Sequence, residues 1–485
     1  MSAAGGAILE RLASRICAFT RHDLTPLSLA RARTGITDTI GVTLAGIPEP
    51  CAQILLRTPG VATAPGAALV FGTARRTSAL DAALVNGTAS HALDYDDFSG
   101  DLGGHQSVPL VAPLFALAEE RGLSGMRLVQ AYVVGMETLI RLARAVNFVH
   151  YDKGWHPTST LGVFGAAAAS AHMIGLDAPR TAIALSLAAS MASGLKANFG
   201  TMAKPFHAGH CARNGLLAAL MAEQGFVANP GVMEHHQGFL DVFNGPGNHD
   251  ATRIFEGWGR PWEVEAPGIA LKQFPCCGST HPAIAMMLKL VREEGITAAV
   301  VERIEVLPHA RRLPHTDNPH PTTPLGAKFS VQYAVVRALL SGTPKLADFE
   351  GEAALDPEAQ RLLALTTARA HPDMPRDGAA QWGAEVIVTL RDGRRLSRRV
   401  NQMVGRGGDN PMSSDELWEK FHDCAERGLA RENIAPLFDR LDAIEEVGDM
   451  RDLTRLLEYT APLGGGPRFA EVERQGMPLE TGWVP

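Results

Sequence analysis

Apolar residues recur every three to four positions through most of the first half of the chain, which is the spacing of helices with one buried face. This spacing predicts helices over residues 110–121, 127–147, 158–175, 179–195 and 211–225. Pro179 suits a first helical turn, where no N–H donor is needed, and Gly122, Gly175 and Gly225 stand where helices end. Ala, Gly and Ser are abundant in these segments, so the pattern favours a closely packed, buried bundle.

The pattern changes near residues 262–267. Alternating apolar and polar residues predict strands over 300–308, 384–390 and 395–400, with Asp392 and Gly393 in the turn of a hairpin between the last two. A helix is expected over 329–340. Ser413 and Glu416 have the spacing of a capping box at the start of a helix, and 439–457 is expected to be helical with a break at Gly448. We therefore expect a mainly α protein with helical residues 1–266, a smaller α+β domain at 267–405, and helices at 406–485 that rejoin the first domain.

Composition and charge narrow the class of protein. The 485 residues are 46% hydrophobic and 20% charged with a net charge of -7, which argues against nucleic acid or an anionic membrane as the main partner. No apolar run is long enough to span a bilayer, and no signal-peptide pattern is present, so we expect a cytoplasmic protein. The six cysteines are scattered without a C-x-x-C pair, as reduced thiols are. His207 and His210 have no evident third ligand, so no metal site is expected.

The segment 86–109, NGTASHALDYDDFSGDLGGHQSVP, carries the most distinctive chemistry. It places Asp94, Asp96 and Asp97 in a Gly-rich stretch directly before a long apolar helix. Like charges this close disfavour joint ionisation, and a carboxylate tuned in this way can act as a general acid or base near neutral pH. The alternative is a solvated loop followed by a helix cap.

Other polar residues stand in apolar or Gly-rich settings at the expected ends of elements, where binding groups are often held. They are His105, His156, Lys204, His207, Lys272 and His281. Lys204 is expected in a turn-like stretch before the helix at 211–225. Two lysines and several histidines can neutralise the carboxylates of a small anion, while an aspartate or histidine removes a proton from the carbon next to a carboxylate. Lys328, Tyr333 and Cys277 are further candidates to line such a site, although core packing or capping would also explain individual residues.

Several other classes lack their motifs. The chain has no G-x-x-x-x-G-K-[ST] phosphate loop, no G-x-G-x-x-G after a strand, and no G-x-S-x-G nucleophile elbow. Nucleotide-dependent chemistry and serine hydrolysis are therefore not indicated.

A set of motifs resembles the MmgE/PrpD family, which includes 2-methylcitrate dehydratase, cis-aconitate decarboxylase and iminodisuccinate epimerase. The matching stretches occur in the expected order between about residues 35 and 425: NGTASHALDYDD, GHQSVP, GWHPTSTLG, AKPFHAGHCARNG, FPCCGSTH, KFSVQYAV and GDNPMSSDELWEKF. The resemblance implies a large helical domain built from both chain ends, an inserted α+β lid, a homodimer, a site between the domains, and no metal, flavin or nucleotide cofactor.

Carried over by position, the resemblance implies an active site formed by Asp94, His105, His156, Lys204 and Lys272. His105 or His156 would transfer the proton, and the lysines would hold carboxylates. We expect Phe98, His207, Cys277, His281, Lys328 and Tyr333 to contact substrate. This chain has Phe98 where family members often have Thr, and Cys277 where animal-type decarboxylases have a histidine and fungal-type ones a cysteine.

The sequence therefore predicts a lyase that dehydrates or decarboxylates a small di- or tricarboxylic acid by proton transfer at the carbon α to a carboxylate. An epimerase of a small dicarboxylate that uses the same proton abstraction is the first alternative. A non-catalytic helical dimer that binds a metabolite is the second.

Overall fold

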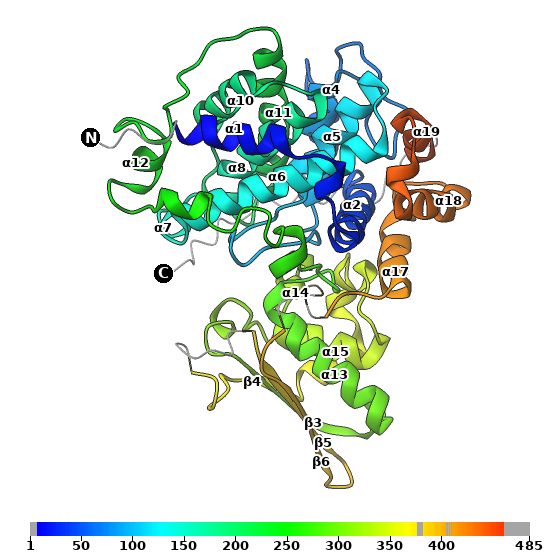
Figure 1. Ribbon diagram of the computed structural model, residues 1–485. Coiled ribbons are helices and arrows are strands. Elements are labelled where there is room, and N and C mark those ends of the chain that lie inside the picture. Colours follow the sequence, from blue (N-terminus) through cyan, green and yellow to red (C-terminus); the bar gives the residue numbers. More distant parts are fainter. Residues whose placement is uncertain (1–6, 376–381, 404–405, 407, 409, 460–485) are drawn as a thin grey trace.

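Helices form most of the chain, and the strands are few and short (Figure 1). The computed structural model describes residues 7–375, 382–403, 406, 408 and 410–459. The helices of the first half are α1 (Ile8–Ala18), α2 (Pro26–Gly46), α3 (Pro50–Arg57), α4 (Ala79–His91), α5 (Val108–Arg121), α6 (Gly125–Val146), α7 (Val149–Asp152), α8 (Pro157–Thr160), α9 (Gly162–Ile174), α10 (Ala178–Met191), α11 (Ala203–Glu223) and α12 (Phe239–Asn244). The later helices are α13 (His281–Glu294), α14 (Pro324–Lys328), α15 (Val331–Ser341), α16 (Pro357–Leu363), α17 (Ser414–Ala425), α18 (Arg431–Asp442) and α19 (Met450–Thr454).

Helices from both halves of the chain share one hydrophobic core. Its buried side chains come from the segment between Leu9 and Ile269 and again from the segment between Phe421 and Leu457. Helix α17 packs against α2, and Figure 1 shows α17, α18 and α19 beside the first-half helices. The structure thus confirms a mainly α fold in which both ends of the chain contribute to the helical part.

Glycines allow α4 and α11 to approach closely. A Cβ atom at Gly87 would lie 2.8 Å from Gly209 Cα, and one at Gly209 would lie 2.2 Å from the carbonyl oxygen of Leu84. Only residues without a side chain fit at such a crossing. The close contact brings His91, at the end of α4, toward the first turn of α11, which carries Lys204.

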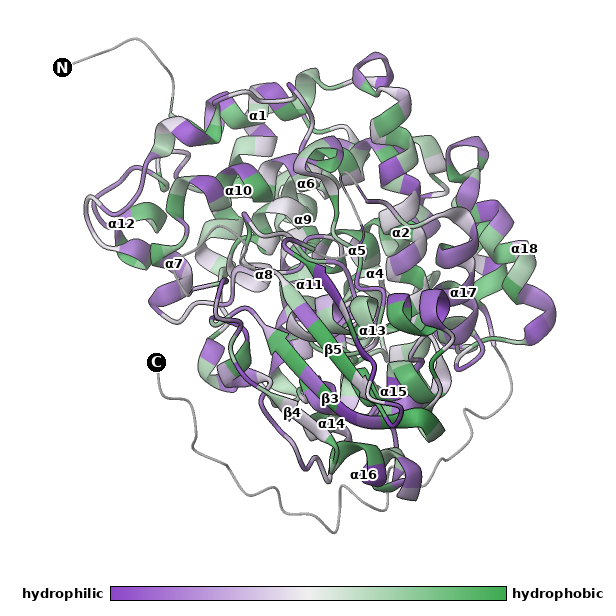
Figure 2. Cartoon of the chain, turned by 90° about the horizontal axis from the view of Figure 1, so that it is seen from below, coloured by the Kyte–Doolittle hydropathy of each residue, from purple (hydrophilic) through white to green (hydrophobic). Residues whose placement is uncertain are grey.

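The smaller part holds a four-stranded sheet in the order β4-β3-β5-β6. Its strands are β3 (Val301–Pro308), β4 (Thr366–Ala368), β5 (Ala384–Leu390) and β6 (Arg395–Val400), and a separate two-stranded pair joins β1 (Ala68–Leu69) to β2 (Arg76–Thr77). β3 pairs parallel with β4 and antiparallel with β5, with Ile304 opposite Val388. Helices α13 and α15 pack on the sheet around a second hydrophobic core, and Figure 2 shows the sheet in front of the helical part when seen from below.

The predicted elements are largely present, and the hairpin turn has Gly393 in the left-handed region at φ 86. The predicted capping box of Ser413 and Glu416 is also present at the start of α17. Four boundaries were wrong. The helix predicted over 158–175 is two helices separated at Leu161, and α10 ends at Met191 rather than residue 195. In the segment predicted over 439–457 the break at Gly448 is present, but the helix before it, α18, begins at Arg431, and the helix after it, α19, is capped by Asp449 and ends at Thr454.

The fourth boundary matters most for the site. Helix α11 begins at Ala203, eight residues before the predicted start at 211, so Lys204 lies in its first turn and not in a loop. Pro205 had suggested a turn, but proline is tolerated in the first turn of a helix because the N–H it lacks has no partner there. Parts of the predicted domains fall outside the described residues, namely 1–6, 376–381, 404–405, 407, 409 and 460–485.

One further finding concerns membranes. Among the described residues, no single helix combines the length and apolar character needed to cross a bilayer, and only α2 with α3, bent by 72°, meets that criterion as a pair.

Candidate active site

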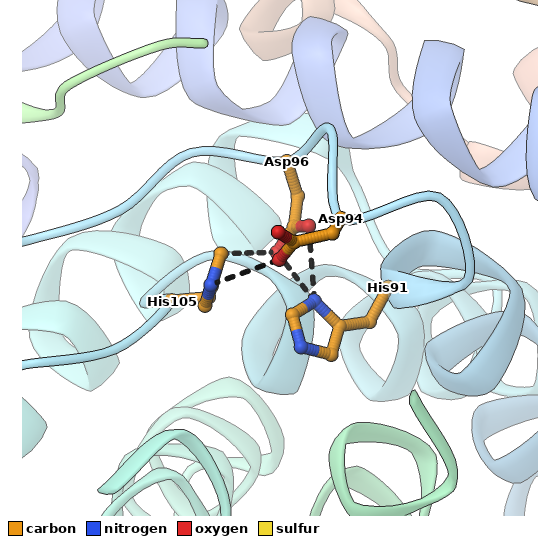
Figure 3. A group of neighbouring side chains, drawn as sticks. All are labelled: His91, Asp94, Asp96 and His105. Carbon is orange, nitrogen blue, oxygen red and sulfur yellow. Dashed lines mark hydrogen bonds and ion pairs between the residues drawn. The ribbon is translucent and has the colours of Figure 1, made fainter. Parts of the chain in front are cut away.

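His91, at the end of α4, and Asp94, Asp96 and His105, in the loop between α4 and α5, form the centre of the site (Figure 3). His91 Nδ1 lies 2.9 Å from Asp96 Oδ1, and His105 Nδ1 lies 2.8 Å from Asp96 Oδ2. Figure 3 shows the two carboxylates between the rings of His91 and His105. His105 Nε2 is also 3.5 Å from Asp94 Oδ1. Each ring nitrogen of His105 therefore has a carboxylate as its neighbour.

Two lysines from distant parts of the chain meet at Asp94. Lys204 Nζ lies 2.6 Å from Asp94 Oδ1, and Lys272 Nζ lies 3.0 Å from Asp94 Oδ2. Lys272 also donates a hydrogen bond to the backbone carbonyl oxygen of Asp94. The Lys272 side chain is 6% exposed, whereas that of Asp94 is 32% exposed. The two ammonium groups thus face a carboxylate that is open to solvent on one side.

His156 and His207 form a second pair of imidazoles next to the first. His156 directly precedes α8, and its Nδ1 lies 3.2 Å from His207 Nδ1 on α11. The His156 ring is 6.0 Å from the His91 ring and 4.8 Å from the Phe199 ring, measured between centroids. His156 is 1% exposed, so solvent has little direct access to its ring.

Charge and burial set distinct protonation states for these groups. Burial acts to raise the pKa of Asp94, but the Lys204 and Lys272 charges outweigh it and hold that pKa well below its usual range. The pKa of Asp96 is likewise well below its usual range, because His105 and His91 outweigh burial. Burial lowers the pKa of His91 to about 4 and lowers that of His156 well below its usual range. Near neutral pH the site therefore holds two carboxylates and at least two neutral imidazoles.

Asp97 differs from its two neighbours. It is buried, accepts hydrogen bonds from Ser107 and Gln106, and lies near Asp38 and Asp96. Burial together with those two carboxylates raises its pKa well above the usual range. The direction agrees with the prediction that one aspartate of the cluster has a raised pKa, but burial is the largest cause and, of the other two aspartates in the cluster, only Asp96 contributes.

The four groups of Figure 3 have the donor atoms of a metal site, since one ligand atom from each lies within 4.8 Å of the others. The contacts that these groups already make favour binding of an anion over binding of a metal ion. Asp94 already bonds two ammonium groups, and Asp96 bonds two imidazoles. A divalent cation would have to displace the lysine charges, so this arrangement suits an anion better than a metal.

The other predicted contact residues are Phe98, Cys277 and His207, followed by three from the smaller part of the chain. Phe98 is half-buried, pairs through its backbone with Ala270, and has its ring 5.7 Å from that of Trp382. Cys277 donates its backbone N–H to the Lys328 carbonyl oxygen, and burial raises the pKa of its thiol, which argues against a reactive thiolate. His207 belongs to the site through His156, as described above.

The smaller part of the chain holds Cys277 and three further predicted contact residues. His281 is buried with Nε2 3.3 Å from the Cys276 carbonyl oxygen, and burial lowers its pKa to about 3. Lys328 is half-buried, and burial lowers the pKa of its ammonium group. Tyr333 is fully buried and donates its hydroxyl to the Asp348 carbonyl oxygen. The structure therefore does not bring Tyr333 to the site, because the tyrosine belongs to the core beneath the sheet.

The sequence did not single out His91, and Asp96 was named only as a member of the acidic cluster and not among the expected site residues. Both stand in the NGTASHALDYDD segment that drew attention to Asp94. No helix ending at His91 is predicted from the sequence, and it is this helix end, followed by a turn, that places residue 96 beside residue 91.

Comparison with known proteins gives this geometry a context. The family model described as the MmgE/PrpD N-terminal domain matches residues 10–251, and the model of the MmgE/PrpD C-terminal domain matches residues 274–442. This chain belongs to the MmgE/PrpD family. Lys272 falls between the two matched segments, where the chain crosses from the helical part to the sheet part.

Curated relatives match across nearly the whole length. Cis-aconitate decarboxylase from Mus musculus is 28% identical over 466 residues, covering 93% of this chain and 93% of the relative. Cis-aconitate decarboxylase from Aspergillus terreus is 26% identical over 454 residues, covering 88% and 91%. 2-Methylcitrate dehydratase from Cupriavidus necator is 26% identical over 462 residues, covering 87% and 91%.

Proposed function

We propose that this MmgE/PrpD protein is a lyase that acts on a small di- or tricarboxylic acid of the citrate or aconitate type. The observation that carries the proposal is the pair of lysine ammonium groups that meet at Asp94, next to His105 and the buried His156. Such a site can hold a carboxylate at one end of a substrate and move a proton at the other. The relatives named as decarboxylases and a dehydratase act on substrates of this kind by their names.

Both candidate reactions need positive charge near a carboxylate and a group that moves a proton. In decarboxylation of an unsaturated acid, the bond from carbon to the departing carboxylate breaks and carbon dioxide leaves. The electron pair moves into a new double bond, and the far carbon of the former alkene takes up a proton. In dehydration, a base removes the proton α to a carboxylate while the hydroxyl on the next carbon leaves as water.

The residues have matching roles in this proposal. Lys204 and Lys272 bind a substrate carboxylate and stabilise the negative charge that develops next to it, as preorganised cations do. A proton held on His105 is paired with the carboxylates of Asp94 and Asp96, so His105 is the leading proton donor. His156 is neutral near pH 7 because burial lowers its pKa, so it is the leading acceptor.

Phe98 and its neighbours form the wall of the candidate site that faces the sheet-containing part of the chain. The Arg312 guanidinium stacks 3.6 Å from the centroid of the Trp382 ring, and that ring faces Phe98. We propose that Phe98 and Cys277 contact the substrate from this side, with His281 and Lys328 behind them.

The family resemblance supports four further proposals. They are a division of the chain near residues 267 and 405, a homodimeric state, a cytoplasmic location and independence of a bound cofactor. Light scattering during size-exclusion chromatography tests the homodimer.

The deciding experiment is proton NMR of the purified protein in D2O with cis-aconitate, citrate, 2-methylcitrate and iminodisuccinate. We expect new alkene signals or loss of carbon dioxide with one of the first three. Deuterium incorporation into a substrate whose connectivity is unchanged would instead establish an epimerase. Silence across the panel, with tartrate and malate added, would contradict the lyase proposal and favour a non-catalytic metabolite-binding dimer.

A further inference from the structure

Lys420 is a buried cation that the proposed reaction does not use. It lies on α17, and its Nζ is 2.6 Å from Asp38 Oδ1 on α2. The Lys420 side chain is 3% exposed, and that of Asp38 is 0% exposed. A buried ion pair generally contributes no more net stability than well-packed apolar residues of similar size. Stability alone therefore does not explain why this pair is present.

The same ammonium group holds the loop that carries Asp94. Lys420 Nζ donates a hydrogen bond to the Tyr95 carbonyl oxygen at 2.9 Å and lies 4.0 Å from the centroid of the Tyr95 ring. The Tyr95 hydroxyl donates to the Gln273 carbonyl oxygen at 3.1 Å, one residue beyond Lys272. Tyr95 is thus fixed through its main chain by α17 and through its side chain by the segment that supplies Lys272.

Asp94 needs this support because of its backbone. Its φ of 52 lies in the left-handed region, which residues with a Cβ atom rarely adopt. A conformation of this kind persists only where its surroundings determine it strongly. Two successive carbonyl groups of the turn, those of Asp94 and Tyr95, each accept a hydrogen bond from a lysine, namely Lys272 and Lys420.

We infer that Lys420 is a positioning residue: anchored by Asp38, it fixes the Tyr95 peptide and so directs the Asp94 carboxylate. Asp94 in turn sets where the ammonium groups of Lys204 and Lys272 stand. The expected loss of turnover without Lys420 rests on the proposed function. The expected loosening of the loop that carries Asp94 does not. The inference gives the C-terminal helix α17, whose Lys420 bonds the Tyr95 main chain and whose Cys424 packs with Leu93 and Tyr95, a role in building the site.

The informative variant replaces both members of the buried pair, Asp38→Leu with Lys420→Met. Removing Lys420 alone would leave a buried carboxylate without a counter-charge, which destabilises a fold broadly, whereas an apolar pair is tolerated. The double variant therefore removes the hydrogen bond to Tyr95 with little loss of stability. The matched control is Arg33→Met, which breaks another ion pair between α2 and the C-terminal part, at Glu445.

The first readout needs no substrate. Hydrogen–deuterium exchange followed by mass spectrometry should show faster exchange of peptides covering residues 92–99 in the double variant, at a melting temperature near that of the wild type. The Arg33→Met control should exchange like the wild type over these residues. Unchanged exchange over 92–99 in the double variant would overturn the inference, even if the wild type proved inactive and the proposed function failed.

The second readout is turnover. We expect kcat of the double variant to fall by about 10- to 100-fold, as a misplaced catalytic group causes, with a smaller change in KM. Adding Asp94→Asn to the wild type and to the double variant tests the route of this effect. If Lys420 acts through Asp94, the loss largely disappears in the Asp94→Asn background. An equal loss in both backgrounds would contradict a positioning role.

Discussion

Replacement of Lys204 by methionine tests the electrostatic basis of the site. Lys204 Nζ lies 2.6 Å from Asp94 Oδ1, so a substrate carboxylate on the other side of this ammonium group would lie about 5 Å from that oxygen. Without the cation, two negative charges at this distance repel by about 3 kcal/mol at an effective dielectric constant near 20. Asp94 is 32% exposed, so solvent screens part of this repulsion. We expect about 2 kcal/mol to remain, roughly a thirtyfold loss in kcat/KM.

The assay is steady-state turnover of whichever substrate the NMR panel identifies. The matched control is Lys196→Met, which also removes one lysine charge. Lys196 Nζ donates a hydrogen bond to the Tyr151 carbonyl oxygen and not to Asp94, so this variant leaves the Asp94 contacts in place. A second variant combines Lys204→Met with Asp94→Asn and so removes the repulsion itself. Its KM should be closer to the wild-type KM than the KM of the Lys204→Met variant is. The reasoning is refuted if Lys204→Met stays within about threefold of the wild type, or if Lys196→Met loses as much.

Three further predictions follow from other parts of the structure. His105→Gln keeps hydrogen bonding but cannot carry a proton, so kcat should fall at least about a hundredfold at an unchanged melting temperature, and retained turnover would exclude His105 as the proton donor. Burial lowers the pKa of His150 to about 4, whereas an unfolded histidine titrates near 6.5, so only the unfolded chain takes up this proton between those values. Stability should therefore fall as the pH is lowered from about 6.5 to 4, by up to about 3 kcal/mol from this residue, and urea unfolding should show a smaller pH dependence in His150→Gln. Gly209→Ala places a Cβ 2.2 Å from the Leu84 carbonyl oxygen, so we expect it to push α11 from α4 and to cost about 1–3 kcal/mol as well as activity. Gly448→Ala, where a Cβ meets nothing within 4 Å, should change neither, and equal melting temperatures for the two variants would contradict this account.

Much of the fold was accessible from the sequence because its signals are local. Helical spacing, the capping box at Ser413 and the turn at Gly393 each depend on a few neighbouring residues, and all appear in the structure. The start of α11 was missed because Pro205 and several glycines suggested a turn. The glycines serve instead to let α11 approach α4, which is a property of two helices and not of one segment.

The candidate site could be predicted only in part for the same reason. Residue types and the family motifs selected Asp94, His105, His156, Lys204 and Lys272, and the structure brings these five side chains into one connected group with His91, Asp96 and His207. The sequence could not show that Asp94 is the meeting point of two lysines more than 60 residues apart, because that contact depends on the path of the chain between them. Tyr333 illustrates the opposite error, since its hydroxyl satisfies a backbone carbonyl within the second core.

The path of the chain between the two hydrophobic cores has a consequence for protein engineering. Ile269 belongs to the first core and Phe274 to the second, so Lys272 lies on the short bridge between them, while its partner Asp94 belongs to the helical part. Neither half, expressed separately, would carry a complete set of charges around the substrate. Chimaeras that join the helical part of one relative to the sheet part of another should therefore keep this bridge and the Asp94 loop from the same parent.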